Sequence, residues 1–162
     1  MTTQSRIKNE MKNMIENHSD EFFAYPSEND YLNWHFTIKG PKNTEFEGGI
    51  YHGILNLNNN YPSNQPTIQF FTPNGRFAVN TALCLYTLSN KGWQTNWTLI
   101  NLLEALINYM PIQESHTGSI SESKEKRLEY AKNSSQFKCE KCGLATEHIK
   151  GNVNFEINKK MD

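Results

Sequence analysis

Cys84 is the first residue of this sequence whose chemistry needs an explanation. It lies between two leucines, and free cysteine is a small hydrophobe that is most often buried, so these neighbours favour a core position. The preceding residues favour another role, because Pro73-Asn74-Gly75 predicts a turn and Asn80-Thr81 is too polar for a buried strand. A thiolate is both a strong nucleophile and a good leaving group. Acyl transfer is therefore the chemistry that Cys84 could perform.

The other two cysteines, Cys139 and Cys142, form a Cys-x-x-Cys pair followed by Gly143. Such a pair is half of a typical zinc site, and His148 is a candidate third ligand. No fourth ligand is evident from the sequence, so we expect no bound metal and no cofactor. The alternative is a structural pair of thiols at a helix end, one packed inward, with Gly143 as the C-cap.

Composition limits the classes of protein that fit. The 162 residues suit one domain with a single core, and 36% apolar content can fill it. Sixteen basic and seventeen acidic side chains give a net charge of −1, which argues against nucleic acid as a partner. No signal peptide and no membrane-spanning segment is expected in this chain. Three cysteines are too few for a secreted disulfide framework, so we expect a reducing compartment, the cytosol or nucleus.

Hydrophobic periodicity predicts the elements that position Cys84. Apolar residues at helical spacing predict an amphipathic helix from Thr2 or Thr3 to about Asn17. Alternation predicts three strands, Tyr31–Lys39, Ile50–Leu57 and Thr67–Phe71, within an antiparallel meander of four. One apolar face from Leu99 to Met110 predicts a buried helix that Pro111 ends. The order helix, strands, cysteine segment and helices indicates an α+β domain.

The C-terminal third is predicted to be helical and then weakly structured. Ser119-Ile120-Ser121-Glu122 reads as a capping box that opens a charged helix to about Phe137, with Leu128 and Ala131 facing inward. Beyond Gly143 the pattern weakens and we expect fraying. The predicted organisation is a core domain of residues 1–143 and a weakly structured extension of residues 144–162.

Five stretches in order resemble the ubiquitin-conjugating enzymes. They are WHFTIKGP (Trp34–Pro41), FEGGIYHGIL (Phe46–Leu55), YPSNQPTI (Tyr61–Ile68), TPNGRF (Thr72–Phe77) and LCL (Leu83–Leu85), followed by the pair Trp93 and Trp97. The TPNGRF form, together with CEKCG at Cys139–Gly143, is similar to the J-type branch of that family. The resemblance implies the ubiquitin-conjugating fold over most of the chain.

The resemblance also implies a reaction. Cys84 would accept the carboxyl terminus of ubiquitin as a thioester from an ATP-dependent activating enzyme, then release it to a substrate lysine or, as the alternative, a hydroxyl. No histidine is close to Cys84 in the sequence, which agrees with a thiol that is not strongly activated. Asn74 is the candidate donor that stabilises the oxyanion in the transfer step, and Asn80 is its competitor. The structural alternative for Asn74 is a turn former.

A proton acceptor for the incoming nucleophile is expected on the loop after the buried helix. His116 has the most suitable pKa, with Glu114 and Ser115 as alternatives. A solvated loop histidine is the alternative reading.

Partner surfaces follow from the same resemblance. It implies ubiquitin, the activating enzyme, a RING-type ligase and substrate proteins as partners, with no nucleic acid. The contact zone would contain three groups of residues: Arg6, Lys8 and Lys12; Ser63-Asn64; and Trp97-Thr98. An ordinary solvated helix face is the alternative for any single lysine. Position 63 departs from the family pattern, since many relatives carry a large apolar residue where this chain has Ser63.

Two other functions compete with conjugation. A silent ubiquitin-binding relative typically lacks the cysteine that Cys84 provides, and a cysteine hydrolase needs a histidine and an orienting partner for which no local signature is present. The expected role is protein quality control and degradation. The expected location is cytoplasmic, with the cytosolic face of the endoplasmic reticulum as the site typical of J-type relatives.

Overall fold

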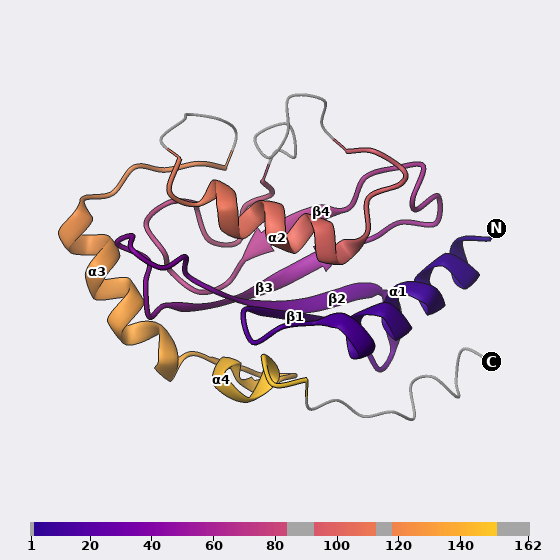
Figure 1. Cartoon of the computed structure of the whole chain (residues 1–162), viewed down its shortest axis with the longest axis horizontal. Helices are drawn as coiled ribbons and strands as arrows, with labels where there is room; N and C mark the ends of the chain where they lie inside the picture. The colour runs from indigo at the N-terminus through magenta and orange to yellow at the C-terminus, as the bar shows by residue number, and fades with distance from the viewer. Residues whose placement is uncertain (1, 84–92, 113–117, 152–162) are drawn as a thin grey trace.

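The computed structural model of the chain describes residues 2–83, 93–112 and 118–151. In chain order, the described elements are α1 (Thr3–Asn17), β1 (Phe22–Ser27), β2 (Asp30–Lys39), β3 (Ile50–Asn56), β4 (Thr67–Phe70), α2 (Leu99–Tyr109), α3 (Lys124–Asn133), the 3-10 turn η2 (Ser134–Gln136), β5 (Lys138–Cys139), β6 (Gly143–Leu144) and α4 (Ala145–His148). Figure 1 shows one sheet between α2 on one side and α4 on the other.

The main sheet is a four-stranded antiparallel meander in the order β1-β2-β3-β4, as the sequence predicts. Alternating hydrophobicity located β2, β3 and β4 to within one residue at each end. No alternating pattern marks β1 in the sequence, because its first five residues are all buried. In the register, Thr37 of β2 lies opposite His52 of β3, and Phe36 lies opposite Gly53.

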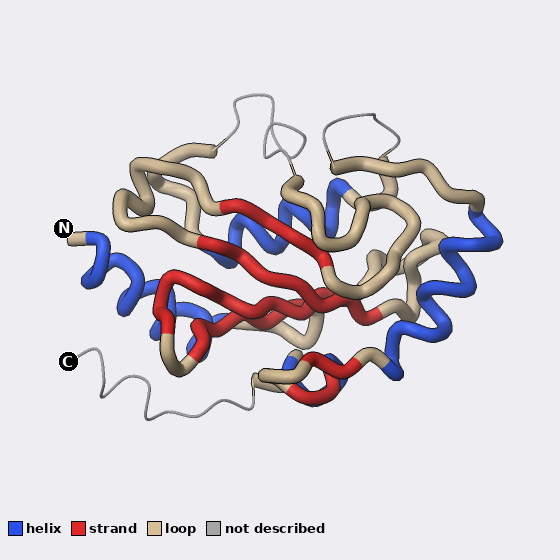
Figure 2. Tube along the Cα trace, turned by 180° about the vertical axis from the view of Figure 1, so that it is seen from behind, coloured by secondary structure: helices blue, strands red, loops and turns tan. Residues whose placement is uncertain are grey.

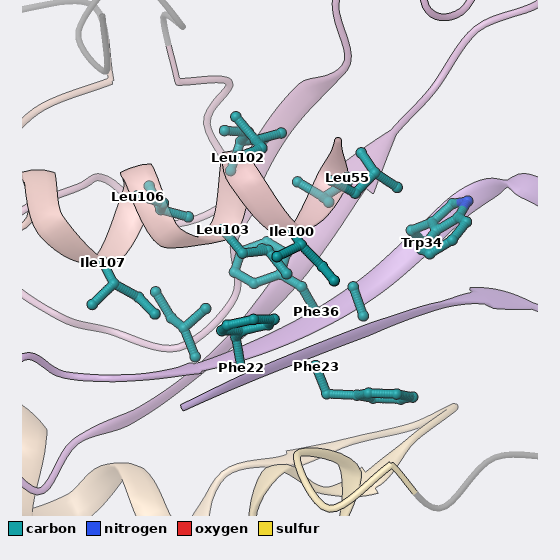
Figure 3. Close-up of a cluster of buried hydrophobic side chains, with 14 of the residues drawn as sticks. Phe22, Phe23, Trp34, Phe36, Leu55, Ile100, Leu102, Leu103, Leu106 and Ile107 are labelled. Atoms are coloured by element: carbon teal, nitrogen blue, oxygen red, sulfur yellow. The ribbon is translucent and has the colours of Figure 1, made fainter. Parts of the chain in front are cut away.

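The two faces of this sheet differ in what covers them. Phe22 and Phe36 point toward α2, whose Leu103 and Leu106 are fully buried against the sheet (Figure 3). Phe23 points to the opposite side (Figure 3), where its ring meets that of His148 at 5.3 Å between centroids. The sheet is therefore covered on both faces, by α2 on one and by the C-terminal segment, residues 138–151, on the other.

Helix α1 matches its prediction. Thr2 is the N-cap, and its side chain accepts a hydrogen bond from the backbone N–H of Ser5. The helix buries Ile7, Met11 and Met14, which share one face at the predicted spacing. Helix α2 likewise follows prediction, with Thr98 and Asn101 forming a capping box.

Helix α3 begins later than the sequence predicts. Its N-cap is Ser123, because residues 119–122 instead pair with an earlier loop through the bonds from Ile120 N–H to Arg76 O and from Glu122 N–H to Gly75 O. The prediction for Leu128 is wrong, since that side chain is 48% exposed while Arg127 is 2% exposed. Arg127 takes the inward position because it pairs with Glu45 at 2.8 Å.

The segment after Gly143 differs from the expected loose extension. Residues 144–151 continue the fold as the end of the β5–β6 hairpin and as α4, which buries Ala145 and His148. Figure 2 shows this hairpin and α4 packed beside the sheet. Residues 152–162, the rest of the expected extension, lie outside the described part of the chain. Within the described ranges, no helix has the length and apolar character needed to cross a membrane.

Candidate active site

The chain leaves β4, forms a turn and returns along the same strand. Val79 forms a parallel bridge with Phe70, and Leu83 forms an antiparallel bridge with Ile68. The N–H of Leu83 donates to the carbonyl of Ile68 at 2.9 Å, and the Leu83 side chain is 6% exposed. The residue immediately before Cys84 is thus fixed to the sheet.

Asn74 organises the turn at the start of this segment. Its Oδ1 accepts hydrogen bonds from the N–H groups of Arg76 and Phe77, at 2.9 and 2.7 Å, and its Nδ2 donates to Thr72 O at 3.1 Å. The residue is 1% exposed. Gly75 follows with φ of +83°, a conformation that glycine adopts without strain. All of these contacts correspond to the turn-forming role, and the oxyanion role of Asn74 stays a prediction.

Asn80, the competing donor, has a different environment. It is exposed and adopts φ of +57°, in the left-handed region that asparagine tolerates better than most residues. Its N–H donates to Phe70 O at 2.8 Å, which fixes its backbone against β4. Its side chain is therefore accessible at a position four residues before Cys84.

Two buried arginines that the sequence analysis did not single out hold this turn. Arg76 is 1% exposed, donates from Nε to Ile112 O at 3.0 Å and stacks over the rings of Phe77 and Tyr109. Arg127 donates from Nε to Gly75 O at 3.1 Å and from Nη1 to Glu45 Oε1 at 2.8 Å. Arg76 belongs to the TPNGRF stretch, and its place in that motif was the sequence feature that could have identified it as a structural residue of the turn.

The contact with Arg127 helps to lower the pKa of Glu45. Partial burial on its own would raise the pKa of Glu45, but hydrogen bonds from its own backbone N–H and from Arg127, with the charge of that guanidinium, outweigh burial and lower it. Glu45 therefore stays ionised beside the buried Arg127. The pair connects the loop before β3 to the turn that begins the cysteine segment.

A second segment lies beside the first. Gly118 O accepts from Ala78 N–H at 2.8 Å, and Phe77 forms a bridge with Ser119. A side chain at residue 118 would have its Cβ 2.7 Å from Ala82 O, so this close approach requires glycine. Gly118 and Ser119 therefore contact the residues that precede Cys84.

Four predicted site residues fall in stretches that the structure leaves out. Cys84 lies outside the described residues, and so do Glu114, Ser115 and His116. Their roles stay predictions. The described neighbours of the two stretches are close together, since a Cβ at residue 118 would lie 2.7 Å from Ala82 O.

Arg6 and the two loops predicted to bind partners lie on one surface that hydrogen bonds connect. Arg6 donates to the carbonyls of Thr95 and Trp97, at 3.1 and 2.6 Å, which joins α1 to the loop before α2. Trp93 Nε1 donates to Pro62 O at 2.7 Å, next to Ser63. Lys12, Ser63 and Asn64 are exposed, and Lys8, Trp97 and Thr98 are half-buried. Arg6 therefore has a structural role within this surface, while Lys12 and the 63–64 loop remain accessible.

A buried carboxylate supports the same surface. Glu10 is 3% exposed, and its Oε2 accepts hydrogen bonds from the Tyr61 hydroxyl and from Leu99 N–H. Burial raises the pKa of Glu10, although the Tyr61 hydrogen bond and the charge of Arg6 oppose the rise. Glu10 thus satisfies the first N–H of α2 and ties that helix to α1.

Comparison with known proteins identifies the family. Residues 6–141 match the family model described as ubiquitin-conjugating enzyme. The chain therefore belongs to the ubiquitin-conjugating enzyme family, as the five motifs predict.

Two curated relatives specify the branch. The chain is 39% identical to ubiquitin-conjugating enzyme E2 6 of Kluyveromyces lactis over 135 residues, which cover 82% of this chain and 53% of the relative. It is 38% identical to human ubiquitin-conjugating enzyme E2 J1 over 134 residues, which cover 81% of this chain and 42% of that relative. The J-type resemblance is confirmed. The chain spans about half the length of the curated relatives it matches.

A solved structure confirms the fold. A putative ubiquitin conjugating enzyme from Plasmodium yoelii superposes with a TM-score of 0.61 at 27% identity, over 68% of this chain and 73% of that one. The helix, the four-stranded meander and the later helices are thus the ubiquitin-conjugating fold.

Proposed function

We propose that this chain carries ubiquitin as a thioester on Cys84 and transfers it to an acceptor amine. The observation that carries the proposal is the family match, which runs continuously from residue 6 to residue 141 and so includes Cys84. The anchoring of Leu83 on β4 supports it, because a nucleophile must be presented from a fixed backbone.

The reaction consists of two acyl transfers on one sulfur atom. In the first, the Cys84 thiolate attacks the thioester carbonyl of ubiquitin on the activating enzyme, and the enzyme's thiolate leaves. In the second, a lysine amine attacks the Cys84 thioester, loses its proton to a base, and the Cys84 thiolate leaves. Each transfer exchanges one acyl bond for another, so ATP is needed only by the activating enzyme.

The neighbouring residues receive distinct roles in this proposal. Asn74 acts as a positioning residue, because its amide is buried and bonded within its own turn. Asn80 is the better-placed donor for the oxyanion, because its side chain is exposed and its backbone is fixed. His116 remains the candidate proton acceptor, with Glu114 and Ser115 as alternatives.

The proposed partners are ubiquitin, the activating enzyme, a RING-type ligase and substrate proteins. The surface formed by α1, the 61–64 loop and the 93–98 loop is the proposed contact zone for the activating enzyme and the ligase. Quality control at the cytosolic face of the endoplasmic reticulum is the proposed setting, supported by the relationship to E2 J1.

A charging assay tests the proposal. The chain is incubated with activating enzyme, ATP and ubiquitin, and its intact mass is measured with and without a thiol reductant. We expect an ATP-dependent increase of one ubiquitin that the reductant removes. A protein that only binds ubiquitin would show no covalent adduct, and a cysteine hydrolase would cleave ubiquitin derivatives without ATP; either result would refute the proposal.

A further inference from the structure

Four side chains with metal-binding atoms gather on the face of the sheet opposite α2. They are His35 from β2, His52 from β3, Cys139 from β5 and Cys142 from the β5–β6 turn, and one ligand atom of each lies within 4.8 Å of all the others. His35 Nδ1 is 3.2 Å from His52 Nε2 and 3.6 Å from Cys139 Sγ. Three of the four residues are buried, and Cys142 is half-buried.

Two of these separations, 3.2 Å between His35 Nδ1 and His52 Nε2 and 3.6 Å between His35 Nδ1 and Cys139 Sγ, are close to those of a tetrahedral zinc site. Zn–N bonds of about 2.05 Å and Zn–S bonds of about 2.3 Å at tetrahedral angles place two nitrogens about 3.4 Å apart and a nitrogen and a sulfur about 3.6 Å apart. We propose that His35, His52, Cys139 and Cys142 bind one zinc ion. No fourth ligand for the cysteine pair was evident from the sequence. In the structure, His35 of β2 and His52 of β3 are the third and fourth ligands.

The hairpin that carries the two thiols is built for this arrangement. Cys139 pairs with Gly143 across β5 and β6, so the intervening turn brings Cys142 back beside Cys139. Gly143 has φ of +75°, and no atom lies within 4 Å of where its Cβ would be. The glycine is therefore required by backbone conformation and not by crowding. Both sulfurs thus face the sheet from one short turn.

Outer hydrogen bonds orient one of the histidines. His52 Nδ1 is 2.8 Å from Thr37 Oγ1, and the same hydroxyl is 2.7 Å from His148 Nδ1. If His52 Nδ1–H donates to Thr37 and the Thr37 hydroxyl donates to His148, the lone pair of His52 Nε2 is left for the metal. Zinc-bound histidines commonly use such a partner on the second ring nitrogen. His148, the third ligand considered from the sequence, thus belongs to the outer shell.

The charges balance in a buried site. Burial lowers the pKa of His52 to about 3, so its imidazole is neutral, which is the ligating form. Burial and the neighbouring Cys139 raise the pKa of Cys142 to about 12, whereas zinc binds cysteine as the thiolate. With Zn²⁺ bound, two thiolates and two neutral imidazoles surround the ion. The resulting site has no net charge.

The proposed role is structural. Four protein ligands leave no open coordination position for a substrate. The ligands come from β2, β3 and the C-terminal hairpin, whereas Leu83, the residue before Cys84, pairs with Ile68 of β4. A cleft lined by Asn33, His35, Phe71, Phe137 and Cys139 gives the ion a path to the site. The ion would join the C-terminal segment to the two central strands.

Metal content and proton release test this proposal on the full chain. The protein is unfolded in denaturant with a chelator, refolded with or without equimolar Zn²⁺, and desalted. We expect one zinc per chain by elemental analysis, and release of protons on zinc binding from calorimetry in buffers of different ionisation enthalpy.

Two matched variants complete the test. Cys142→Ser changes a half-buried residue on a turn, so the fold should persist while zinc affinity falls at least about tenfold. Cys84→Ser makes the same chemical change at the third cysteine and should retain zinc fully. Failure of refolded wild-type protein to bind zinc, or equal binding by Cys142→Ser and wild type, would overturn the proposal. Neither result depends on whether Cys84 accepts ubiquitin.

Discussion

Replacement of Asn74 separates the two roles considered for this residue. Asn74→Ala removes an acceptor from the N–H groups of Arg76 and Phe77 and a donor to Thr72 O, at a residue that is 1% exposed. Two buried N–H groups without partners cost about 1–3 kcal/mol each when nothing relaxes. Because a loop can relax in part, we expect the free energy of unfolding to fall by roughly 3 kcal/mol.

Asn74→Asp is the matched variant. Its carboxylate keeps both acceptor bonds but cannot donate to Thr72 O, so we expect a smaller loss, about 1–2 kcal/mol. Urea denaturation of both variants measures these losses, and single-turnover discharge of the charged protein to free lysine measures the chemistry. If Asn74 only positions the turn, the discharge rate of Asn74→Asp should be within a few-fold of wild type, whereas Asn80→Ala should discharge roughly a hundredfold more slowly.

The opposite pattern would refute this assignment. If both Asn74 variants unfold like wild type yet discharge about a hundredfold more slowly, then Asn74 supplies the oxyanion donor and leaves its turn bonds in the transfer step. Unchanged discharge in Asn80→Ala would remove Asn80 from the mechanism.

Two further predictions concern the scaffold. Glu45→Gln should destabilise the fold by about 2 kcal/mol because Arg127 stays buried without a charged partner. Because the folded-state pKa of Glu45 is lowered, its ionised form stabilises the protein above the unfolded-state value of about 4.5, and this stabilisation is lost as pH falls through the folded-state value. In urea denaturation, the free energy of unfolding should therefore decline less steeply below pH 4.5 in the variant than in wild type. An equal decline would contradict the pairing. Leu103→Ala should lower the free energy of unfolding by about 3 kcal/mol, and Leu128→Ala, at a side chain 48% exposed, by less than about 0.5; similar losses would contradict the packing.

The sequence was informative where a pattern is local. The period-two alternation of β2 and β3 and the apolar face of α2 are properties of single segments, so their positions could be predicted. The strand β1 was missed because its residues are buried on both faces. The first turn of α3 was misplaced because residues 119–122 pair with the distant residues Gly75 and Arg76, an interaction that no local motif records.

Local sequence patterns predicted less of the active site and of the proposed zinc site than of the fold. Cys84 was identifiable from its neighbours and from the family motifs. The turn role of Asn74 needed the positions of the Arg76 and Phe77 N–H groups. His35 and His52 are 17 residues apart in sequence, and only the β2–β3 register, with Thr37 opposite His52, brings them together near the hairpin. A one-residue slip would place them on opposite faces of the sheet.

The claim that Cys84 is the acceptor is tested most directly at that residue. Wild type, Cys84→Ser and Cys84→Ala are charged in parallel with activating enzyme, ATP and ubiquitin, and the modified residue is located by peptide mass spectrometry. We predict a reductant-sensitive adduct in wild type, a reductant-resistant oxyester on residue 84 in Cys84→Ser because an alkoxide is the poorer leaving group, and no adduct in Cys84→Ala. A reductant-sensitive ubiquitin adduct on folded Cys84→Ala would place the thioester on Cys139 or Cys142 and contradict the assignment.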